Sequence, residues 1–185
     1  MKSGFMEKVK VDLGCGNNKK EGFIGIDIAP LEHVDIVCNL GKTSIPLKSN
    51  SVDAIFSFHF LEHVENVSFI IEEIYRVLKP GGIAEIIVPH FSNIGAYHWS
   101  HKTYWNARGL DFVEKTCFCH YYCPNVNFKI LKRNIEFSEK RNYSPTIFEK
   151  LIGWRYMSMY LYEKWLSSLF RAYQIRVIME KQENI

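Results

Sequence analysis

Short apolar runs separated by glycine-containing turns dominate the first half of the chain. Five of these runs are rich in Val and Ile and are predicted as strands, at residues 9–13, 23–27, 34–38, 52–59 and 83–89. Nearly continuous apolar runs of this kind are typical of a parallel sheet that is covered on both faces. The pattern therefore predicts an α/β fold built on a doubly wound, mostly parallel sheet.

The clearest helix is predicted between the fourth and fifth of these strands. Apolar residues recur there at the spacing of one helix face, from Val67 to Leu78. The sequence Pro-Gly-Gly at residues 80–82 is expected to end this helix and turn the chain into the next strand. Further along, residues 128–137 and 174–181 are predicted strands, and residues 145–171 are predicted to be helical.

Composition indicates one soluble globular domain over residues 1–185. Hydrophobic residues make up 47% of the chain and charged residues 23%. We find no apolar run of about 18 residues and no apolar signal core near Met1, so we expect no membrane span and a cytoplasmic location. The 5 cysteines are irregularly spaced, which fits reduced thiols better than a disulfide framework.

The two halves of the chain differ in charge and in aromatic content. Residues 1–90 hold 9 Lys and Arg against 12 Asp and Glu, whereas residues 91–185 hold 14 against 8. Most of the aromatic residues also follow residue 90. We interpret the first half as a scaffold that binds a cofactor. Segments 90–124 and 140–171 are interpreted as insertions on the substrate side, able to face an anionic or ring-bearing acceptor.

The most informative stretch is Val-Asp-Leu-Gly-Cys-Gly at residues 11–16, where a predicted strand ends in a glycine loop. Gly14 and Gly16 allow a tight turn whose backbone can come close to a ligand. Asp12 can orient that loop through its backbone N–H groups, or can reach an amino group of the ligand. A dinucleotide site would require a third glycine where Lys19 stands, and a full helix after the loop. The dinucleotide alternative is therefore disfavoured.

Asp27 ends the second predicted strand, within Gly-Ile-Asp-Ile at residues 25–28. Ligands of open parallel sheets bind beyond the carboxyl ends of the strands, which places Asp27 beside the glycine loop. A carboxylate there can accept hydrogen bonds from both hydroxyls of a ribose. The alternative is a surface or capping carboxylate, and the neighbouring glycine loop favours the ribose interpretation.

These stretches resemble the motifs of the class I S-adenosylmethionine-dependent methyltransferases over about residues 9–90. Besides the two motifs above, Ser-Val-Asp-Ala-Ile-Phe-Ser at residues 51–57 resembles the motif of the fourth strand. Leu-Glu-His-Val at residues 61–64 and the stretch from Glu73 to Gly82 follow it in the family's order. Within the family, the chain is most similar to small methyltransferases associated with surface polysaccharides. The resemblance implies a Rossmann-like sheet whose last strand is antiparallel.

The resemblance also implies roles for individual residues around S-adenosylmethionine. The backbone of Gly14, Cys15 and Gly16 would lie against the methionine part of the cofactor, and Asp27 would hold the ribose hydroxyls. Ile28 would pack on the adenine, with Asn39 and Leu40 at its edge. The methyl-sulfonium end would be lined by Ser57, Phe58 and His59. Almost nothing precedes the first strand. We therefore expect the cofactor to be left more open, or to be covered by residues 90–124 or by a second copy of the chain.

Methyl transfer from a sulfonium needs no acid, and it needs a base only when the acceptor must lose a proton. His59 and His90 are the candidate catalytic bases, because both follow strands at the ligand-binding edge and histidine titrates near neutrality. Each could instead make only a structural hydrogen bond. Glu62 and His63 are expected to cap the following helix or to brace the sheet.

Two further histidine- and cysteine-rich stretches raise the alternative of a metal site. His98 and His101 are only three positions apart and Cys117 and Cys119 only two, and Cys119 and Cys123 are the one pair that fits the ligand spacing of zinc sites. We therefore predict no metal ligands and expect buried thiols in an aromatic lid.

The sequence predicts a methyltransferase that acts on a small-molecule or saccharide acceptor, with a homodimer as an open alternative to a monomer. A second hypothesis is a non-catalytic cofactor-binding subunit that serves a partner. A third is a nucleic-acid methyltransferase. The positive charge after residue 90 permits it, but the tetrapeptide typical of such enzymes is replaced here by Ser-Phe-His-Phe at residues 57–60.

Overall fold

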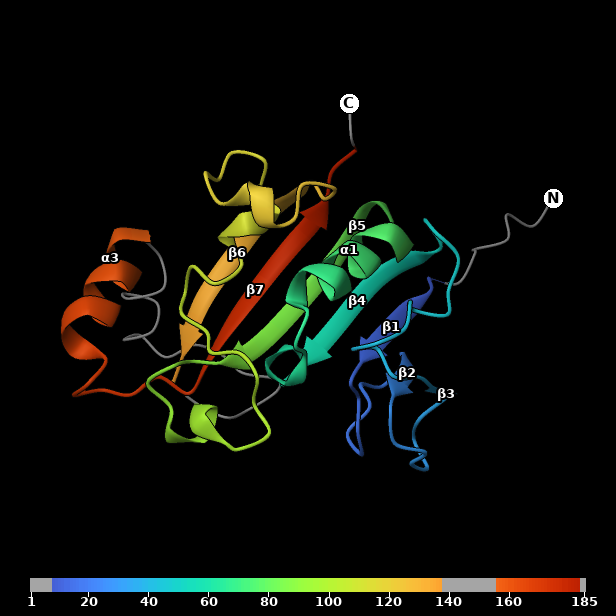
Figure 1. The fold of residues 1–185 in the computed structure, drawn as a ribbon, viewed down its shortest axis with the longest axis horizontal. Coiled ribbons are helices and arrows are strands. Elements are labelled where there is room, and N and C mark those ends of the chain that lie inside the picture. Colours follow the sequence, from blue (N-terminus) through green and yellow to red (C-terminus); the bar gives the residue numbers. More distant parts are fainter. Residues whose placement is uncertain (1–7, 138–155, 184–185) are drawn as a thin grey trace.

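The computed structural model describes residues 8–137 and 156–183, which form a sheet of seven strands in the order β3-β2-β1-β4-β5-β7-β6 (Figure 1). The strands β1 to β5 are parallel, and β7 runs antiparallel to both of its neighbours, β5 and β6. This order confirms the predicted Rossmann-like, mostly parallel sheet with an antiparallel last strand. The strands are β1 Lys10–Leu13, β2 Ile24–Asp27, β3 Ile36–Val37, β4 Val52–Phe58, β5 Leu78–Pro89, β6 Phe128–Glu136 and β7 Gln174–Lys181.

Helix α1, Val67–Val77, packs on one face of the sheet through the apolar stripe that the sequence predicts. Ile70, Ile71 and Ile74 are completely buried. The helix begins at Asn66, whose side chain accepts a hydrogen bond from the Phe69 N–H at 3.0 Å. Glu62 and His63 therefore do not cap this helix, because Asn66 supplies the cap.

Strand β5 begins earlier than the sequence predicts. It begins at Leu78, directly after α1, and residues 79–82 bulge out before the regular pairing of Ala54 with Ile83. Gly81 has a φ of +74° in this bulge, a conformation that favours glycine. The Pro-Gly-Gly sequence thus ends the helix as predicted, but the turn it makes is an irregularity within a strand.

The segment between β5 and β6 contains only short helical turns, and it covers the same face as α1 (Figure 1). These are single turns of 3₁₀-helix, namely η2 Ile94–Tyr97, η3 Asp111–Val113 and η4 His120–Tyr122; a similar turn, η1 Leu61–His63, follows β4. Trp105, Leu110 and Val113 from this segment join the main core cluster with α1. The predicted aromatic lid is therefore in part a layer of the core.

The second predicted helix lies partly outside the described residues. Of the predicted range 145–171, residues 145–155 are not described. Of the remainder, residues 156–166 form α3, Tyr156–Leu161, and the π-helix η5, Tyr162–Leu166, whereas residues 167–171 are not helical. Tyr162 and Met159 pack with Ile135 of β6 in a smaller cluster. Among the described residues, no helix is both long and apolar enough to cross a bilayer.

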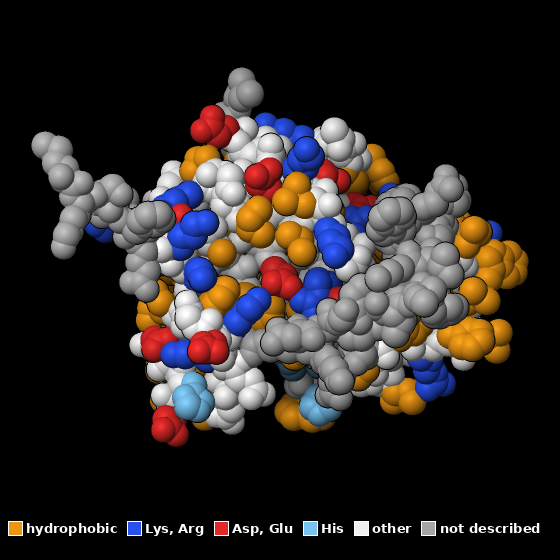
Figure 2. All heavy atoms as spheres, turned by 180° about the vertical axis from the view of Figure 1, so that it is seen from behind, with side chains coloured by type: hydrophobic (Ala, Val, Ile, Leu, Met, Phe, Trp, Pro, Cys, Tyr) orange, Lys and Arg blue, Asp and Glu red, His pale blue; other side chains and the backbone are white. Residues whose placement is uncertain are grey.

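The opposite face of the sheet carries charged groups, which the expectation of a sheet covered on both faces did not anticipate (Figure 2). Arg176 of β7 pairs with Glu136 of β6 and with Glu85 of β5. The ammonium of Lys20 reaches Glu85 at 3.1 Å and lies 3.7 Å from the centre of the Phe56 ring. Ion pairs and a cation–π contact therefore cover described parts of this face.

One pair of cysteines differs from the expectation of reduced thiols. Cys117 and Cys119 form a disulfide, because the turn between them brings their Cα atoms to 5.2 Å. Cys15, Cys38 and Cys123 are free.

Candidate functional site

A pocket of about 390 Å³ opens beyond the carboxyl ends of four parallel strands. Its walls come from the loops after β1, β2, β3 and β4, where an open parallel sheet binds ligands. The volume lies within the range of small-molecule and cofactor sites. The lining residues are Gly14, Asp27, Ile28, Cys38, Asn39, Leu40, Gly41, His59, Phe60, His63 and Val64.

The glycine loop after β1 forms one wall of this pocket. Gly14 has a φ of +66° and Gly16 a φ of +51°, and both values favour glycine. The Phe60 ring lies only 2.5 Å from the position that a Gly14 side chain would take. Only glycine therefore allows the backbone and Phe60 to meet at this wall.

Asp27 ties the glycine loop to the end of β2. Its carboxylate accepts one hydrogen bond from the Gly16 N–H and one from the Ala29 N–H, each 2.9 Å long. A carboxylate has about four acceptor positions, so these two bonds leave capacity for two hydroxyl donors. The structure thus brings Gly14 and Asp27 together at a single pocket, as a bound nucleoside requires, whereas Gly16 does not line the pocket and holds the loop to Asp27.

Two of the predicted cofactor residues support the loop from behind instead of lining the pocket. Asp12 is fully buried and accepts a hydrogen bond from the Lys20 N–H at 2.7 Å. The Cys15 sulfur lies against Gly25, and burial raises the pKa of this thiol to about 11. At physiological pH the thiol is therefore neutral, and Cys15 does not line the pocket.

The end of β4 contributes His59 to the pocket but not Ser57 or Phe58. Ser57 is completely buried, and its hydroxyl has no hydrogen-bond partner among the described residues. Phe58 stacks on the His59 ring with 4.3 Å between the ring centres. His59 adopts a φ of +52°, which is uncommon for a residue with a side chain and often marks a functional position.

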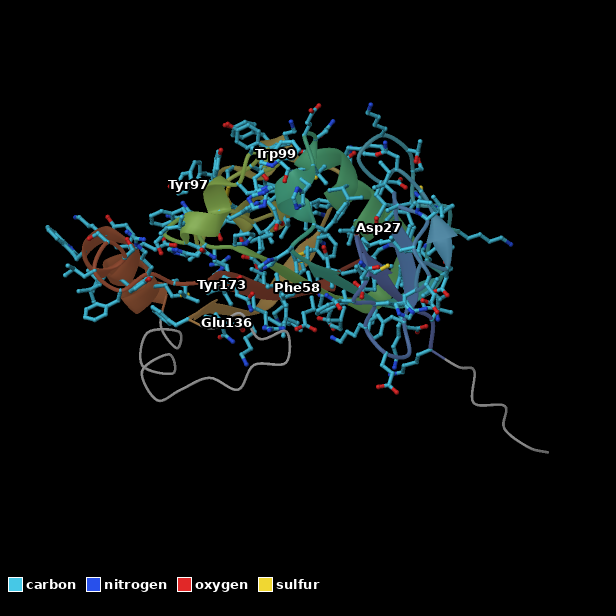
Figure 3. The ribbon with its side chains drawn as sticks, turned by 90° about the horizontal axis from the view of Figure 1, so that it is seen from below. Asp27, Phe58, Tyr97, Trp99, Glu136 and Tyr173 are labelled. Carbon is cyan, nitrogen blue, oxygen red and sulfur yellow. A yellow bond between two sulfur atoms is a disulfide. The ribbon has the colours of Figure 1, made fainter. Side chains whose placement is uncertain are left out.

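A chain of polar side chains orients His59 from the neighbouring strands. The Gln174 amide nitrogen donates to Glu136 at 2.6 Å, so the amide oxygen is the atom that faces His59. This oxygen lies 3.1 Å from His59 Nε2, which must therefore donate. Nδ1 then carries the lone pair of the neutral ring. Figure 3 views the strand ends and shows Glu136, Tyr173 and Phe58 close together there, with Asp27 further along the sheet.

His90, the other predicted base, lies elsewhere. It is completely buried, and its Nδ1 accepts the Ser92 N–H at 3.1 Å. Nε2 must then donate, and it lies 3.2 Å from the Glu163 carboxylate. His90 does not line the pocket described above. A structural role thus explains its contacts, and His59 is the better placed candidate.

Sequence reasoning missed several pocket residues, among them Phe60, His63 and Val64. They belong to η1 and its flanks, directly after β4, so their position after a strand end was the available signal. Glu62 of η1 is also buried, and burial raises the pKa of its carboxyl to about 8.

Residues 11–86 match a family model described as "Methyltransferase domain". The match ends within β5, so it covers the four loops that line the pocket. A curated relative, cycloartenol-C-24-methyltransferase of Arabidopsis thaliana, is 35% identical over 74 residues. That alignment covers 38% of this chain and 22% of the relative, so the chain matches about a fifth of that protein's length.

Solved structures share the fold over nearly the whole chain. A SAM-dependent methyltransferase from Archaeoglobus fulgidus superposes with a TM-score of 0.61 at 20% identity, over 94% of this chain and 86% of that one. The [4+2]-cyclase SpnF superposes with a TM-score of 0.58, also at 20% identity, over 97% of this chain and 77% of the cyclase chain. The structure of a complex between the Haloferax volcanii Trm112 methyltransferase activator and a methyltransferase superposes with a TM-score of 0.58 at 15% identity, over 97% of this chain and 84% of the matched chain.

The fold alone does not select a reaction, because the cyclase shares it. The sequence match adds the glycine loop and Asp27 to the shared fold. Residues 11–86 thus match a methyltransferase domain model, and they lie on a fold that the chain shares with S-adenosylmethionine-dependent methyltransferases.

Proposed function

We propose that the chain binds S-adenosylmethionine in the pocket at the carboxyl ends of β1 to β4 and transfers its methyl group to a small-molecule or saccharide acceptor. The observation that carries this proposal is the convergence of Gly14 and Asp27 on one pocket, with Gly16 hydrogen-bonded to Asp27 beside it. Asp27 would bind the ribose hydroxyls, and the exposed Ile28 would pack on the adenine. Asn39 and Leu40 would flank the adenine edge.

S-adenosylmethionine supplies a methyl group on a positively charged sulfur, which leaves as a neutral thioether. The residues of the chain need only hold the acceptor in line, exclude water and take a proton where the acceptor is a hydroxyl. His59 is suited to the last task, because Gln174 holds its Nε2 as a donor and leaves the lone pair on Nδ1. The contact with Gln174, whose amide is held by Glu136, makes His59 a positioned residue, since the ring cannot turn without losing it.

Exposed aromatic side chains on the segment after β5 support a ring-bearing acceptor. Tyr97 and Tyr104 lie with their ring centres 5.3 Å apart, and Trp99 is 88% exposed on the same segment (Figure 3). This segment meets the pocket where the Ser100 carbonyl oxygen lies 3.3 Å from Nδ1 of His63, a pocket residue. Aromatic faces can stack on the apolar faces of sugar rings, so the arrangement favours a saccharide. A cytoplasmic location and a homodimer stay predictions.

Two measurements test the proposal. Calorimetric titration should show binding of S-adenosylmethionine, and incubation with pools of saccharides and small molecules should release S-adenosylhomocysteine. His59→Ala should reduce turnover by about 100-fold or more while cofactor affinity changes little, since a general base contributes about 10²–10⁴-fold. His33→Ala, at an exposed position outside the pocket, is the control.

The alternatives give different results. Cofactor binding without turnover on any pool would favour the non-catalytic subunit. Turnover only on RNA or DNA would favour a nucleic-acid methyltransferase. Failure to bind S-adenosylmethionine would refute the proposal. Wild-type turnover of His59→Ala would remove His59 from the role of base and leave the methyltransferase assignment standing.

A further inference from the structure

A buried carboxylate and two histidines meet beside the cofactor pocket. Glu62, His63 and His101 each have one potential ligand atom within 4.8 Å of those of the other two. The Glu62 side chain is only 1% exposed, and neither of its oxygens has a hydrogen-bond partner among the described residues. In the described part of the chain, no Lys or Arg forms an ion pair with it.

A carboxylate in this position needs a compensating partner. Burial of an ionised carboxylate without a partner costs several kcal/mol. Protonation would remove the charge but would leave a buried hydroxyl without an acceptor, so it does not satisfy the group. A cation bound directly to the oxygens compensates the charge and the lost hydrogen bonds together.

The two histidines present their lone pairs in the way that metal ligands do. Nδ1 of His101 lies 2.8 Å from the Ala96 carbonyl oxygen, and Nδ1 of His63 lies 3.3 Å from the Ser100 carbonyl oxygen. A carbonyl can only accept, so the His101 ring donates from Nδ1 and carries the lone pair on Nε2. Nδ1 of His63 lies 3.3 Å from the Ser100 hydroxyl as well as from the carbonyl, and donation to the carbonyl leaves the His63 lone pair on Nε2. Histidine ligands of metals are commonly oriented by such a bond from the other ring nitrogen.

Backbone hydrogen bonds join the two segments that carry these residues. The Glu62 carbonyl oxygen accepts the Lys102 N–H at 2.6 Å and the Thr103 N–H at 3.2 Å. The His63 and His101 rings meet edge to face with 4.7 Å between their centres. The candidate ligands are therefore held together by the fold before any ion binds.

We propose that Glu62, His63 and His101 bind one divalent transition metal ion of the zinc type. Two imidazole nitrogens and one carboxylate oxygen suit Zn²⁺, Mn²⁺ or Co²⁺ better than Mg²⁺ or Ca²⁺, which prefer oxygen ligands alone. Ligand atoms about 2.1 Å from one ion lie no more than about 4.2 Å apart, so the three need only a small approach. Three protein ligands leave a coordination position open, as in catalytic zinc sites.

The site is placed to act on the acceptor, and this part of the inference rests on the proposed methyl transfer. His63 also lines the cofactor pocket, so the ion would lie at its edge. A bound divalent ion lowers the pKa of an attached hydroxyl. The acceptor would then be an alcohol or phenol. Its O–H proton leaves to solvent or His59, the new O–CH₃ bond forms, and the S–CH₃ bond breaks with its electron pair retained by sulfur.

Metal binding can be measured without any acceptor. The purified chain is stripped with a chelator and titrated by calorimetry with ZnCl₂, MnCl₂, CoCl₂ and MgCl₂, and the Co²⁺ form is examined by visible absorption. We expect one equivalent of transition metal and a Co²⁺ spectrum typical of nitrogen ligands. Glu62→Gln and His101→Ala should each weaken Zn²⁺ binding by at least about tenfold. Glu65→Gln, which removes an exposed carboxylate three residues away, is the matched control.

Each outcome is decisive for one of the two proposals. Absence of transition-metal binding, or binding that Glu62→Gln and His101→Ala leave unchanged in folded protein, overturns the metal site. Circular dichroism of each variant establishes that it is folded, and the Co²⁺ spectrum of the unaltered chain needs no variant. Calorimetry with S-adenosylmethionine on the same sample tests the cofactor separately. Cofactor binding without metal binding refutes only the metal site, and metal binding without cofactor binding refutes only the proposed function.

Discussion

Replacement of Asp27 by asparagine tests the centre of the proposed cofactor site. The two side chains have nearly the same shape, but the amide has one acceptor oxygen where the carboxylate has two. In the structure the two carboxylate oxygens accept separate backbone hydrogen bonds, from Gly16 and from Ala29. The NH₂ group of the substituted side chain would face one of these N–H donors, and one fewer acceptor would remain for the ribose.

The expected magnitude follows from the hydrogen bonds that change. A hydrogen bond to a charged acceptor contributes about 1.5–3 kcal/mol. Loss of one such bond to a ribose hydroxyl should weaken cofactor binding by about 10- to 150-fold. Asp27→Ala removes both acceptors and should weaken binding at least as much.

The assay is calorimetric titration with S-adenosylhomocysteine, which the protein would not consume. Asp35→Asn is the matched control, because Asp35 also accepts a backbone N–H, that of Gly25 at 2.6 Å, and lies outside the pocket. Its ion pair with Lys19 holds the pKa of Asp35 below its usual value. The control variant should keep its cofactor affinity within about threefold of the wild-type value.

Two results would refute this reasoning. Asp27→Asn could bind S-adenosylhomocysteine with the wild-type Kd, in which case Asp27 does not contact the ligand. Alternatively, Asp27→Asn and Asp35→Asn could weaken binding equally. The effect would then reflect general disturbance of the loops, not a lost contact with the ribose.

Two further predictions concern the scaffold around the pocket. Gly14→Ala should lower the free energy of unfolding by about 1–3 kcal/mol more than Gly22→Ala does, because both glycines have a positive φ but only Gly14 lies against Phe60. Urea unfolding measures both variants, and equal losses of stability would contradict the role of Phe60. Hydrogen bonds from Arg76 hold the pKa of the Glu73 carboxyl below its usual 4.5. The ionised carboxylate therefore stabilises the fold fully above pH 4.5, and this stabilisation is lost as the pH falls through the lowered pKa. Unfolding of Glu73→Gln should therefore be about 1–3 kcal/mol easier than wild type at pH 7, with the difference shrinking towards pH 3; a constant difference would count against this ion pair.

Local patterns in the sequence were sufficient for most of the fold. The strands before residue 90 were predicted within a few residues, because buried parallel strands need short apolar runs. Helix α1 was predicted because its buried face repeats with the helical period. The start of β5 was misplaced, since proline and glycine indicate a turn but do not show whether the turn lies inside a paired strand.

The cofactor pocket was also largely predictable. Gly14, Gly16 and Asp27 follow strand ends, and the parallel topology alone brings those ends to one edge of the sheet. The topology does not give side-chain direction. It therefore could not tell that Asp12 and Cys15 support the loop from behind, or that His59 and not His90 faces the pocket.

What the sequence determined by itself was the scaffold, because each element is specified by residues a few positions apart. The tertiary structure alone decided the contacts between distant segments. His63 meets Ser100 across 37 positions, and His59 meets Gln174 across 115. The local spacing of apolar residues does not indicate such contacts, since they depend on how loops of irregular length pack over the sheet. The carboxylate of Glu62 is for this reason ordinary in the sequence, and only the folded chain shows it buried beside two histidines.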